Sequence, residues 1–541
     1  MKNIIVTEQM MGDNATPILE KIISDAPDGA TITFEAGTYN LATTVMIEGK
    51  KDLTLQGNGA TLAPYFTRET GAEDGAGVFE LLNCKNLVIR GFEVASTVPA
   101  NTAGVIVNST EDYVDVRLNT DTPFTGKELI IDGMIFEGDW WPKGYHWAEA
   151  QFDPKQRTVI AGEIPCSAPK KLNCPHEMLD EKTVRVYTKE YKWQQYSASV
   201  KNLKPGMLCN VSHTYYGLVA FVFRQCDTVL IEDVTMSNYA GFGFLILPHC
   251  HDFTFRRLKT MPTDRSRQPF ALNSDGIHLT GLSGQLVLED CEMDCIGDDR
   301  LNVHTQVMTV ASLCENKMNI IYDKINGRIS PYWSEAGDRL RIYNPETLEF
   351  KGTVTIVSSD CGDITLAPND VDIKVGDYIT NDKYYPDVTI RNCVFSHNRG
   401  RQLCLQGSNK VLIEDCKFIT AASCSLYLSS AFDYWMEAGP LANVTIRNNL
   451  FHDLTGEIIS ERSTILVQIN GARHQNIPPV HKNFLIENNR FENICVPPII
   501  VKLTDGVTIR NNQFINCNKE FDNVRFENCT NVVCENNTVI E

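Results

Sequence analysis

A short phrase of residues recurs along the second half of the chain. Each copy is an apolar run such as residues 388–390, then a charged residue, and then a pair drawn from Asn, Asp and Cys. The closest copies are 23, 23 and 25 residues apart, and the wider intervals of 33 and 40 residues fit the same unit with an added loop. A unit of this length cannot bury its own apolar face, so successive units must stack to make a core. The last residues of the pairs are Cys393, Cys416, Asn449, Asn489, Asn512 and Asn537.

The repeat predicts a right-handed parallel β-helix, an all-β fold. Alternating apolar residues mark three short strands per unit, and clusters of Gly, Asn, Asp and Cys mark the corners between them. Because Asn and Cys recur at one corner, we expect their side chains to form an internal ladder between successive coils. The alternative all-β repeat, a β-propeller, has blades of about 40 residues or more, which is longer than the closest copies here.

An amphipathic helix is predicted at the N-terminal end of the stack. Thr16 is a suitable N-cap, and Pro17 fits the first helical position. Because the open end of a β-helix is an exposed sheet edge, we expect this helix to cover it. The apolar residues that fall on one face of the helix are Ile18, Leu19, Ile22, Ile23 and Ala26.

Two regions lack the phrase and are rich in strand-like alternation. They cover residues 140–213 and 305–384, and each ends on a similar string of residues. We expect them to be two small β-barrel-like modules inserted into the β-helix. The predicted organisation is a cap with the first coils at 1–139, the first module at 140–213, coils carrying candidate acids at 214–304, the second module at 305–384 and C-terminal coils at 385–541.

The composition of the chain argues against two classes of binding partner, nucleic acid and membrane. The formal net charge of −19 argues against nucleic acid, and no run approaches the roughly 20 apolar residues that span a bilayer. The first residues hold no apolar segment of secretory length. The 18 cysteines are scattered inside strand-like runs, which is typical of free thiols in a reducing compartment. We therefore expect a cytoplasmic protein that binds neither nucleic acid nor membrane, and a homo-oligomer stays open.

Three carboxylates are predicted to lie close together although they are distant in sequence. Asp275 precedes the strand-like residues 277–279, and 23 residues further on the pair Asp298 and Asp299 precedes residues 301–303. Stacking of one coil on the next would bring Asp275 about 4.8 Å from Asp299 by backbone spacing. The same alignment places Arg401 in the following coil.

Polar residues face outward from these strands. With apolar side chains pointing inward at period two, one outward row holds His278 and Asn302, and the next holds His304 and Gln406. The predicted acids therefore lie at the edge of a polar surface rather than in the apolar core.

Clustered acids of this kind suit glycoside cleavage. That reaction needs one protonated carboxyl group to donate to the leaving oxygen and one ionised group to activate water or attack carbon. Neighbouring acids push their titrations apart, so one of them can keep its proton near neutral pH. An acid at a β-helix corner otherwise serves the turn backbone, which is the role we expect for Asp233, Asp290 and Asp415.

The motifs resemble two related families. The order Asp-Gly, one unit, Gly-Asp-Asp is similar to that of polygalacturonases, glycoside hydrolase family 28. The wider pattern resembles glycoside hydrolase family 110, the exo-acting α-1,3-galactosidases of the inverting type. The polygalacturonase signatures Gly-His-Gly and Arg-Ile-Lys are absent from the sequence, which disfavours pectic substrates. The resemblance to family 110 rests on residues 274–278, 297–299, Asn302, His304, 398–400, 410–414 and 434–440.

This resemblance implies a β-helical hydrolase that removes terminal α-1,3-linked galactose from an oligosaccharide with inversion, without a metal or cofactor. Asp275, Asp298 and Asp299 would be the catalytic acids. By analogy with polygalacturonases, Asp298 would donate the proton, whereas Asp275 and Asp299 would hold and activate the water.

Further residues are candidates for substrate binding. Trp435 would stack on a sugar face and Glu437 would hold its hydroxyls, although packing of the loop on the second module is an equal alternative. Arg300, Met436 and Ala438 depart from the family pattern, which puts the linkage or acceptor sugar in question rather than the reaction. The substrate-binding candidates are His278, Asn302, His304, Arg401, Gln406, Trp435 and Glu437.

Two other functions stay open. One is a different enzyme on the same scaffold, an endo-glycosidase or a polysaccharide lyase. A lyase would need a Lys or Arg base, often with Ca²⁺, and only Arg300 and Arg401 accompany the acids in the alignment. The other is a non-catalytic carbohydrate-binding β-helix in which the acids stabilise corners.

Overall fold

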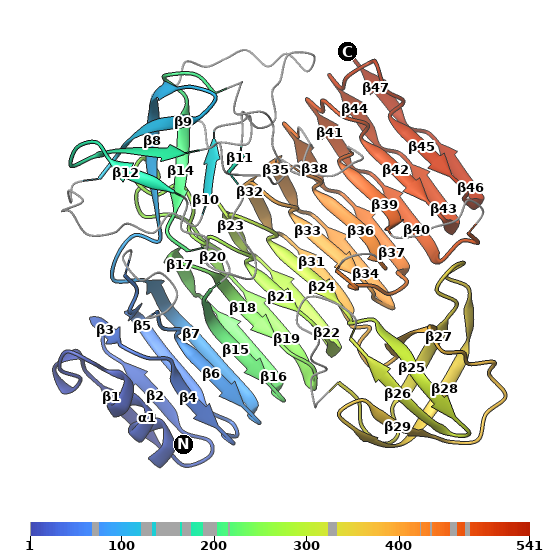
Figure 1. Ribbon diagram of the computed structural model, residues 1–541, viewed down its shortest axis with the longest axis horizontal. Helices are drawn as coiled ribbons and strands as arrows, with labels where there is room; N and C mark the ends of the chain where they lie inside the picture. The colour runs from blue at the N-terminus through green and yellow to red at the C-terminus, as the bar shows by residue number, and fades with distance from the viewer. Residues whose placement is uncertain are drawn as a thin grey trace.

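The chain forms a long stack of parallel β-coils, shown as a computed structural model in Figure 1. The stack runs from the N-terminus at the lower left to the C-terminus at the upper right. Successive coils pair in parallel on each face, which confirms the predicted parallel β-helix. The structure describes residues 2–67, 75–120, 133–136, 163–164, 175–187, 203–214, 217–322, 333–421, 423–432, 435–454, 463–470 and 477–541.

Two of the three faces of the β-helix join into one 23-stranded sheet, because the long strands β5 and β7 pair on both faces. The first of these faces comprises β1 (Asn3–Val6), β2 (Thr31–Phe34), β5 (Thr54–Pro64), β7 (Lys85–Ala95), β16 (Asp227–Glu232), β19 (Cys250–Arg256), β22 (Leu282–Glu289), β31 (Asp387–Arg391), β34 (Lys410–Glu414), β37 (Ala442–Arg447), β40 (His481–Glu487), β43 (Thr504–Arg510) and β46 (Thr530–Glu535). The second adds β3 (Thr38–Leu41), β17 (Thr235–Asn238), β20 (Lys259–Thr260), β23 (Glu292–Asp294), β32 (Val394–Asn398), β35 (Lys417–Ala421), β38 (Leu450–His452), β41 (Arg490–Glu492), β44 (Gln513–Ile515) and β47 (Thr538–Ile540).

The third face is a separate sheet of eleven parallel strands, and it carries the candidate site. Apolar residues alternate along its strands and point into the core that all three faces share. Its strands are β4 (Val45–Glu48), β6 (Phe79–Leu82), β15 (Val219–Arg224), β18 (Phe242–Ile246), β21 (Ile277–Leu279), β24 (Leu301–His304), β33 (Leu403–Gln406), β36 (Leu426–Ala431), β39 (Ile465–Asn470), β42 (Ile499–Lys502) and β45 (Val524–Glu527).

The predicted corner ladder is present. The backbone N–H of Cys393 donates to Cys416 Sγ at 3.5 Å, and the N–H of Cys416 donates to Asn449 Oδ1 at 2.9 Å. The ladder then passes through Asn489 and Asn512, each side-chain oxygen accepting from the coil before it. Because every rung is one coil apart, the ladder fixes the register that the sequence spacing predicts.

Helix α1 (Thr16–Asp25) lies at the N-terminal end of the stack (Figure 1), after the 3-10 helix η1 (Glu8–Met10). Its buried residues Leu19 and Ile23 join the main core, as expected of a cap. The predicted N-cap was one residue too late, since the N-cap is Ala15. The Thr16 hydroxyl donates to the Thr43 carbonyl instead of capping the helix, and so ties α1 to the coil beneath.

The first inserted module is an antiparallel seven-stranded sheet. It begins at β8, earlier than the predicted residue 140. Strands β8 and β9 alternate like coil strands, but they pair antiparallel with each other around the turn at Thr110, a distinction that alternation alone cannot make. No strand pairing closes this sheet among the described residues. Its strands are β8 (Asn101–Ser109), β9 (Tyr113–Leu118), β10 (Gly133–Phe136), β11 (Glu163–Ile164), β12 (His176–Met178), β13 (Thr183–Tyr187) and β14 (Leu208–Ser212).

The second module is a closed six-stranded barrel, and all six strands lie within residues 305–384. Figure 1 shows it on the opposite side of the coil stack from the first module. Within the described part of the chain, no helix is both long and apolar enough to cross a membrane. The barrel strands are β25 (Met308–Cys314), β26 (Lys317–Ile321), β27 (Arg339–Tyr343), β28 (Phe350–Asp360), β29 (Asp363–Leu366) and β30 (Tyr378–Asn381).

Candidate active site

Three consecutive strands of the third face position the acids. Asp275 lies just before β21, Asp298 and Asp299 just before β24, and Arg401 just before β33. The strands pair in register, with Ile277 opposite Leu301 and Leu301 opposite Leu403. One carboxylate oxygen from each of the three aspartates lies within 4.8 Å of the others. The structure therefore brings together the acids that the sequence alignment placed in one column.

Glycines at these corners allow the close approach of the coils. A Cβ atom at Gly276 would lie 2.6 Å from the Arg300 carbonyl oxygen, and one at Gly400 would lie 2.5 Å from the backbone carbon of Asp298. Both contacts are with backbone atoms, which cannot move aside as the end of a side chain can. The Asp-Gly and Arg-Gly-Arg sequences are thus needed to stack the acids.

The corner acids that we expected to be structural differ clearly from this cluster. Asp233, Asp290 and Asp415 are exposed and adopt positive φ angles of 53°, 56° and 56°. Left-handed backbone of this kind is the turn conformation that Asp tolerates well. By contrast, Asp275 and Asp299 are buried, with 6% and 4% of their side chains exposed.

Arg401 holds Asp299 through a two-point ion pair. Arg401 Nε donates to Asp299 Oδ1 at 2.7 Å, its Nη2 contacts Oδ2, and its backbone N–H donates to Oδ1 at 3.1 Å. Burial raises the pKa of Asp299, Arg401 opposes that rise, and Asp298 adds to it. The positive charge beside it thus favours the ionised form of Asp299 against the cost of burial.

Asp275 has a histidine partner instead of an arginine. His278 Nδ1 lies 2.7 Å from Asp275 Oδ2. Burial raises the pKa of Asp275 well above its usual range, and the neighbouring Asp298 and Asp299 raise it further. The cluster therefore contains one acid that keeps its proton more readily than an ordinary aspartate.

Asp298 is the most accessible of the three acids, with 19% of its side chain exposed. Arg399 Nη1 lies 3.8 Å from its Oδ1. Arg399 was not among the predicted site residues, although its position in the sequence Asn398-Arg399-Gly400, one coil after the acid pair, is the signal that could have found it. Asp298 is accordingly the acid best placed to reach a bound sugar.

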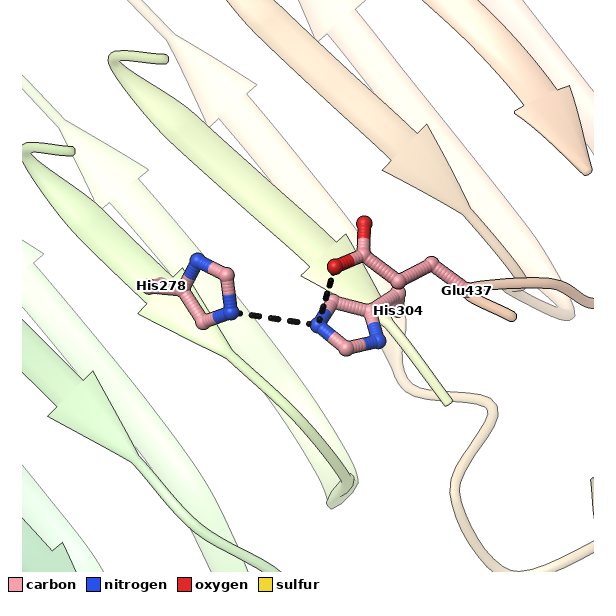
Figure 2. A group of neighbouring side chains, drawn as sticks. All are labelled: His278, His304 and Glu437. Atoms are coloured by element: carbon pink, nitrogen blue, oxygen red, sulfur yellow. Dashed lines mark hydrogen bonds and ion pairs between the residues drawn. The ribbon is translucent and has the colours of Figure 1, made fainter. Parts of the chain in front are cut away.

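Beside the acids lies a trio of His278, His304 and Glu437, drawn in Figure 2. The Nε2 atoms of the two histidines face each other at 3.2 Å, and Glu437 Oε1 lies 3.6 Å from His304 Nε2. Burial lowers the pKa of His278, and burial together with His278 lowers that of His304 well below the usual value. Both rings are therefore neutral near pH 7.

Glu437 is fixed by two amides of the outward rows. Its Oε2 accepts from Gln406 Nε2 at 3.0 Å and from Asn302 Nδ2 at 3.4 Å. Gln406 is held in turn by the Ser429 hydroxyl, which donates to Gln406 Oε1 at 3.2 Å. Of the predicted binding residues, these amides and the His278 trio thus form one connected polar network beside the acids.

The loop that carries Glu437 is attached to the start of the barrel. The Val307 N–H donates to the Met436 carbonyl at 3.0 Å, and the Tyr322 hydroxyl donates to the Trp435 carbonyl at 3.4 Å. Trp435 itself has 48% of its surface exposed. An exposed indole at the margin of a polar site is available to stack on a sugar.

The residues that depart from the family pattern are packing residues. Arg300 is fully buried, donates from Nη2 to the Ser396 carbonyl at 2.7 Å and lies over the Phe395 ring. Burial lowers its pKa to about 9. Met436 and Ala438 belong to the small apolar core between the loop and the barrel. These three residues therefore belong to the packing that supports the site.

Three groups of side chains bring potential metal donors within 4.8 Å of one another: the acid trio, the His278 trio, and Asp294 with Cys295 and His397. In each group the donors already pair with one another or with a neighbouring histidine or arginine, as Asp294 does with His397 and Arg265. Hydrogen bonding accounts for these arrangements, and we assign no metal to them.

Comparison with known proteins agrees with the fold and with the sequence resemblance. The family model described as "Right handed beta helix region" matches residues 347–477. Alpha-1,3-galactosidase B of Bacteroides thetaiotaomicron is 23% identical over 576 residues, covering 97% of this chain and 88% of that protein. A protein of the same name from Akkermansia muciniphila is 26% identical over 363 residues, covering 63% of this chain and 44% of that protein. The predicted resemblance to α-1,3-galactosidases is thus confirmed.

Among solved structures, the family 28 exopolygalacturonase of Yersinia enterocolitica is similar to this chain with a TM-score of 0.45 and 14% identity. The alignment covers 98% of this chain and 78% of that chain.

Proposed function

We propose that this protein is an exo-acting glycoside hydrolase that removes terminal α-1,3-linked galactose from oligosaccharides with inversion. The observation that carries the proposal is the acid trio, in which Asp275, Asp298 and Asp299 oxygens lie within 4.8 Å of one another and Asp298 is partly exposed. Relatives named alpha-1,3-galactosidase over most of the chain support the substrate class. Asp275 and Asp299 are buried and stacked, which argues against a role limited to corner turns.

The proposed mechanism gives each acid a role. Asp298, the most exposed, donates a proton to the glycosidic oxygen as the bond to the anomeric carbon breaks. Asp275 and Asp299 hold a water between them, and their spacing allows one water to bond to both carboxylates. The water oxygen attacks the anomeric carbon and its proton passes to Asp275. Arg401 keeps Asp299 ionised throughout.

The surrounding residues would bind the terminal galactose. Glu437 presents a carboxylate for sugar hydroxyls, and the exposed Trp435 ring offers an apolar surface for a sugar face. His278 and His304 lie beside Glu437, and their ring nitrogens already face each other, Asp275 and the Thr305 carbonyl. Gln406 and Asn302 hold Glu437 in place for this contact.

The test is to incubate the enzyme with an aryl α-galactoside and with the disaccharide Gal-α-1,3-Gal, and to follow the anomeric protons by NMR. We expect β-galactose to appear first from both substrates. Failure to cleave either substrate would overturn the galactosidase assignment, and an ultraviolet-absorbing product would identify a lyase instead. Asp298→Asn should lose activity on the disaccharide, whereas the matched corner variant Asp415→Asn should keep it.

Retention is the second candidate, because the acids lie close together. Retaining glycosidases usually place their two carboxyl groups about 5–5.5 Å apart and inverting enzymes about 6.5–9.5 Å apart, while the nearest oxygens here lie within 4.8 Å. Early release of α-galactose in the same NMR experiment would establish retention and exclude inversion.

We also propose that the protein works in a reducing compartment such as the cytoplasm. All of the described cysteines are free thiols, and most are buried. Neighbouring coils bring Cys393 and Cys416 together in the corner ladder without a disulfide. Unchanged thermal stability after treatment with a reductant would support this proposal.

A further inference from the structure

A continuous chain of hydrogen-bonding groups leads away from Asp275. Asp275 Oδ2 lies 2.7 Å from His278 Nδ1, and His278 Nε2 lies 3.2 Å from His304 Nε2. His304 Nδ1 lies 3.4 Å from the carbonyl oxygen of Thr305, which is the last group in this series of hydrogen bonds. Figure 2 shows the two rings meeting at their Nε2 atoms. We call these groups the proton wire.

The carbonyl at the end of the wire fixes its direction. A carbonyl only accepts, so a hydrogen bond at this position requires a proton on His304 Nδ1, and the Nε2 of a neutral His304 is then bare. His278 Nε2 must donate to that bare nitrogen, which leaves His278 Nδ1 bare as well. The proton between His278 and Asp275 consequently belongs to the Asp275 carboxyl.

Ionisation of Asp275 would disturb this order. To donate to an ionised Asp275, a neutral His278 must move its proton to Nδ1, and two bare Nε2 atoms then face each other at 3.2 Å. Two buried lone pairs without a donor are unfavourable. All hydrogen bonds of the proton wire can therefore form together only when Asp275 is protonated.

We propose that His278 is a positioning residue that, with His304 and the Thr305 carbonyl, stabilises the protonated form of Asp275 and makes this carboxylate a stronger base toward the attacking water. This inference rests on the proposed hydrolysis. As the water oxygen bonds to the anomeric carbon, its proton passes to Asp275, and Asp298 supplies the proton that leaves with the aglycone. Asp275 is then protonated, which is the form that can donate a hydrogen bond to the bare Nδ1 of His278.

The electrostatic surroundings agree with this assignment. Burial favours the uncharged forms of both Asp275 and His278. The three neighbouring carboxylates further favour a proton on Asp275, whereas the single guanidinium opposes it. His304 is faced by His278, Glu437 and Arg401 and is also neutral. The charged groups facing Asp275 and His278 are Asp298, Asp299, Arg401 and Glu437.

The test is the pH profile of kcat/KM in His278→Asn. An Asn amide at this position can still donate to Asp275, but it cannot reach His304, so it favours the ionised acid. We expect the acid limb to move to lower pH by about one unit and kcat to fall on the order of tenfold, as for a weaker base. Circular dichroism and thermal unfolding would check that the variant folds.

His397→Asn is the matched control. His397 Nδ1 lies 2.9 Å from Asp294 Oδ1, so it is a second half-buried Asp–His pair near the acids but outside the wire. Asn also tolerates its positive φ of 51°. This variant should keep the parent pH profile. An unchanged acid limb in His278→Asn, a shift of the alkaline limb alone, or equal shifts in both variants would overturn the proposal.

A second measurement needs no substrate. In full-length protein labelled with ¹⁵N at histidine, the imidazole shifts report which ring nitrogen carries the proton. We expect His304 protonated at Nδ1 and His278 at Nε2 at a pH below the acid limb. A His304 ring protonated at Nε2 would contradict the wire even in an active galactosidase. The expected tautomers in a protein that cleaves no galactoside would leave the wire standing and remove only the proposed function.

Discussion

Arg401 Nε donates to Asp299 Oδ1 at 2.7 Å although the two residues are 102 positions apart in sequence. They lie just before the adjacent strands β24 and β33, and the entire six-stranded barrel is inserted between these two coils. One carboxylate of the acid trio therefore depends on a partner from beyond the insertion. The same insertion anchors the loop that carries Glu437.

Replacing Arg401 by Gln should raise the pKa of Asp299 further, because the guanidinium now opposes the rise that burial causes. If Asp299 must be ionised to hold the water, the acid limb of kcat/KM moves to higher pH and kcat/KM at neutral pH falls on the order of 10²-fold. Steady-state kinetics across pH with an aryl α-galactoside measure both effects.

Arg447→Gln is the control for this change. Arg447 makes the same kind of ion pair, with Glu414 on the preceding coil at 2.6 Å, away from the site. Its pH profile should match that of the parent protein. A downward shift of the acid limb in Arg401→Gln would contradict the role given to Asp299.

Asp298→Asn should separate the proton donor from the two other acids. Loss of a general acid slows reactions that need leaving-group protonation, on the order of 10²–10⁴-fold, but spares substrates whose leaving group is already stable. We expect much greater loss on Gal-α-1,3-Gal than on dinitrophenyl α-galactoside, compared by initial rates. Equal losses on the two substrates would assign the donor role to another residue.

Gly400→Ala tests the close stacking of the coils. The added Cβ would lie 2.5 Å from the backbone carbon of Asp298 and 2.9 Å from the Asp299 nitrogen, so the acid pair must shift. We expect a stability loss of about 1–3 kcal/mol, typical of overpacking, together with a large drop in kcat. Thermal unfolding and kinetics on the aryl galactoside measure these effects. Full activity in a folded variant would show that the acids do not need this spacing.

Asn489→Ala should strongly destabilise the C-terminal coils. The buried Asn489 side chain donates to the Ile446 carbonyl and to Asn512 Oδ1, and accepts from Asn449. Its loss leaves buried groups unpaired, at a cost of about 3 kcal/mol. Denaturant unfolding should show a smaller effect for Asn537→Ala, because that rung is less buried and lies in the last coil. A smaller loss for Asn489 than for Asn537 would refute the ladder as a source of stability.

The buried ring of His481 should make the stability of the folded protein depend on pH. Burial lowers its pKa to about 4, and the neutral ring accepts from the Leu441 N–H and donates to the Gln468 carbonyl. Between pH 6.5 and about 4 the unfolded chain binds a proton that the folded chain does not. Stability should therefore fall with decreasing pH by up to about 1.4 kcal/mol per unit from this group. His481→Gln should make the decline less steep in denaturant unfolding, and an unchanged slope would exclude this assignment.

The coil register could be predicted from residue spacing alone. The intervals between Cys393, Cys416, Asn449 and the later asparagines are the intervals of the observed ladder, including the wide ones. This works because parallel coils repeat the same corner, so sequence similarity between copies reports spatial adjacency directly. The same reasoning predicts that Asp275 lies beside Asp299, as it does in the structure.

Other features did not follow from local pattern. The first module begins at Asn101 rather than at residue 140, because β8 and β9 alternate like coil strands and only their antiparallel pairing distinguishes them. Arg399 was missed because an arginine at a corner is ordinary in sequence, and its position near Asp298 depends on how the coil folds back. The N-cap moved by one residue because the Thr16 hydroxyl bonds across to Thr43.

The parallel β-helix, its register and the column of acids could all be predicted from residue spacing, since each follows from a periodicity that successive coils must share. The charges and protonation of the site could not, because they depend on which acid contacts Arg401, which contacts His278, and how Glu437 reaches the histidines. Those contacts join segments separated by an inserted barrel, and burial and orientation, which set proton affinities, belong to the folded arrangement rather than to any repeat.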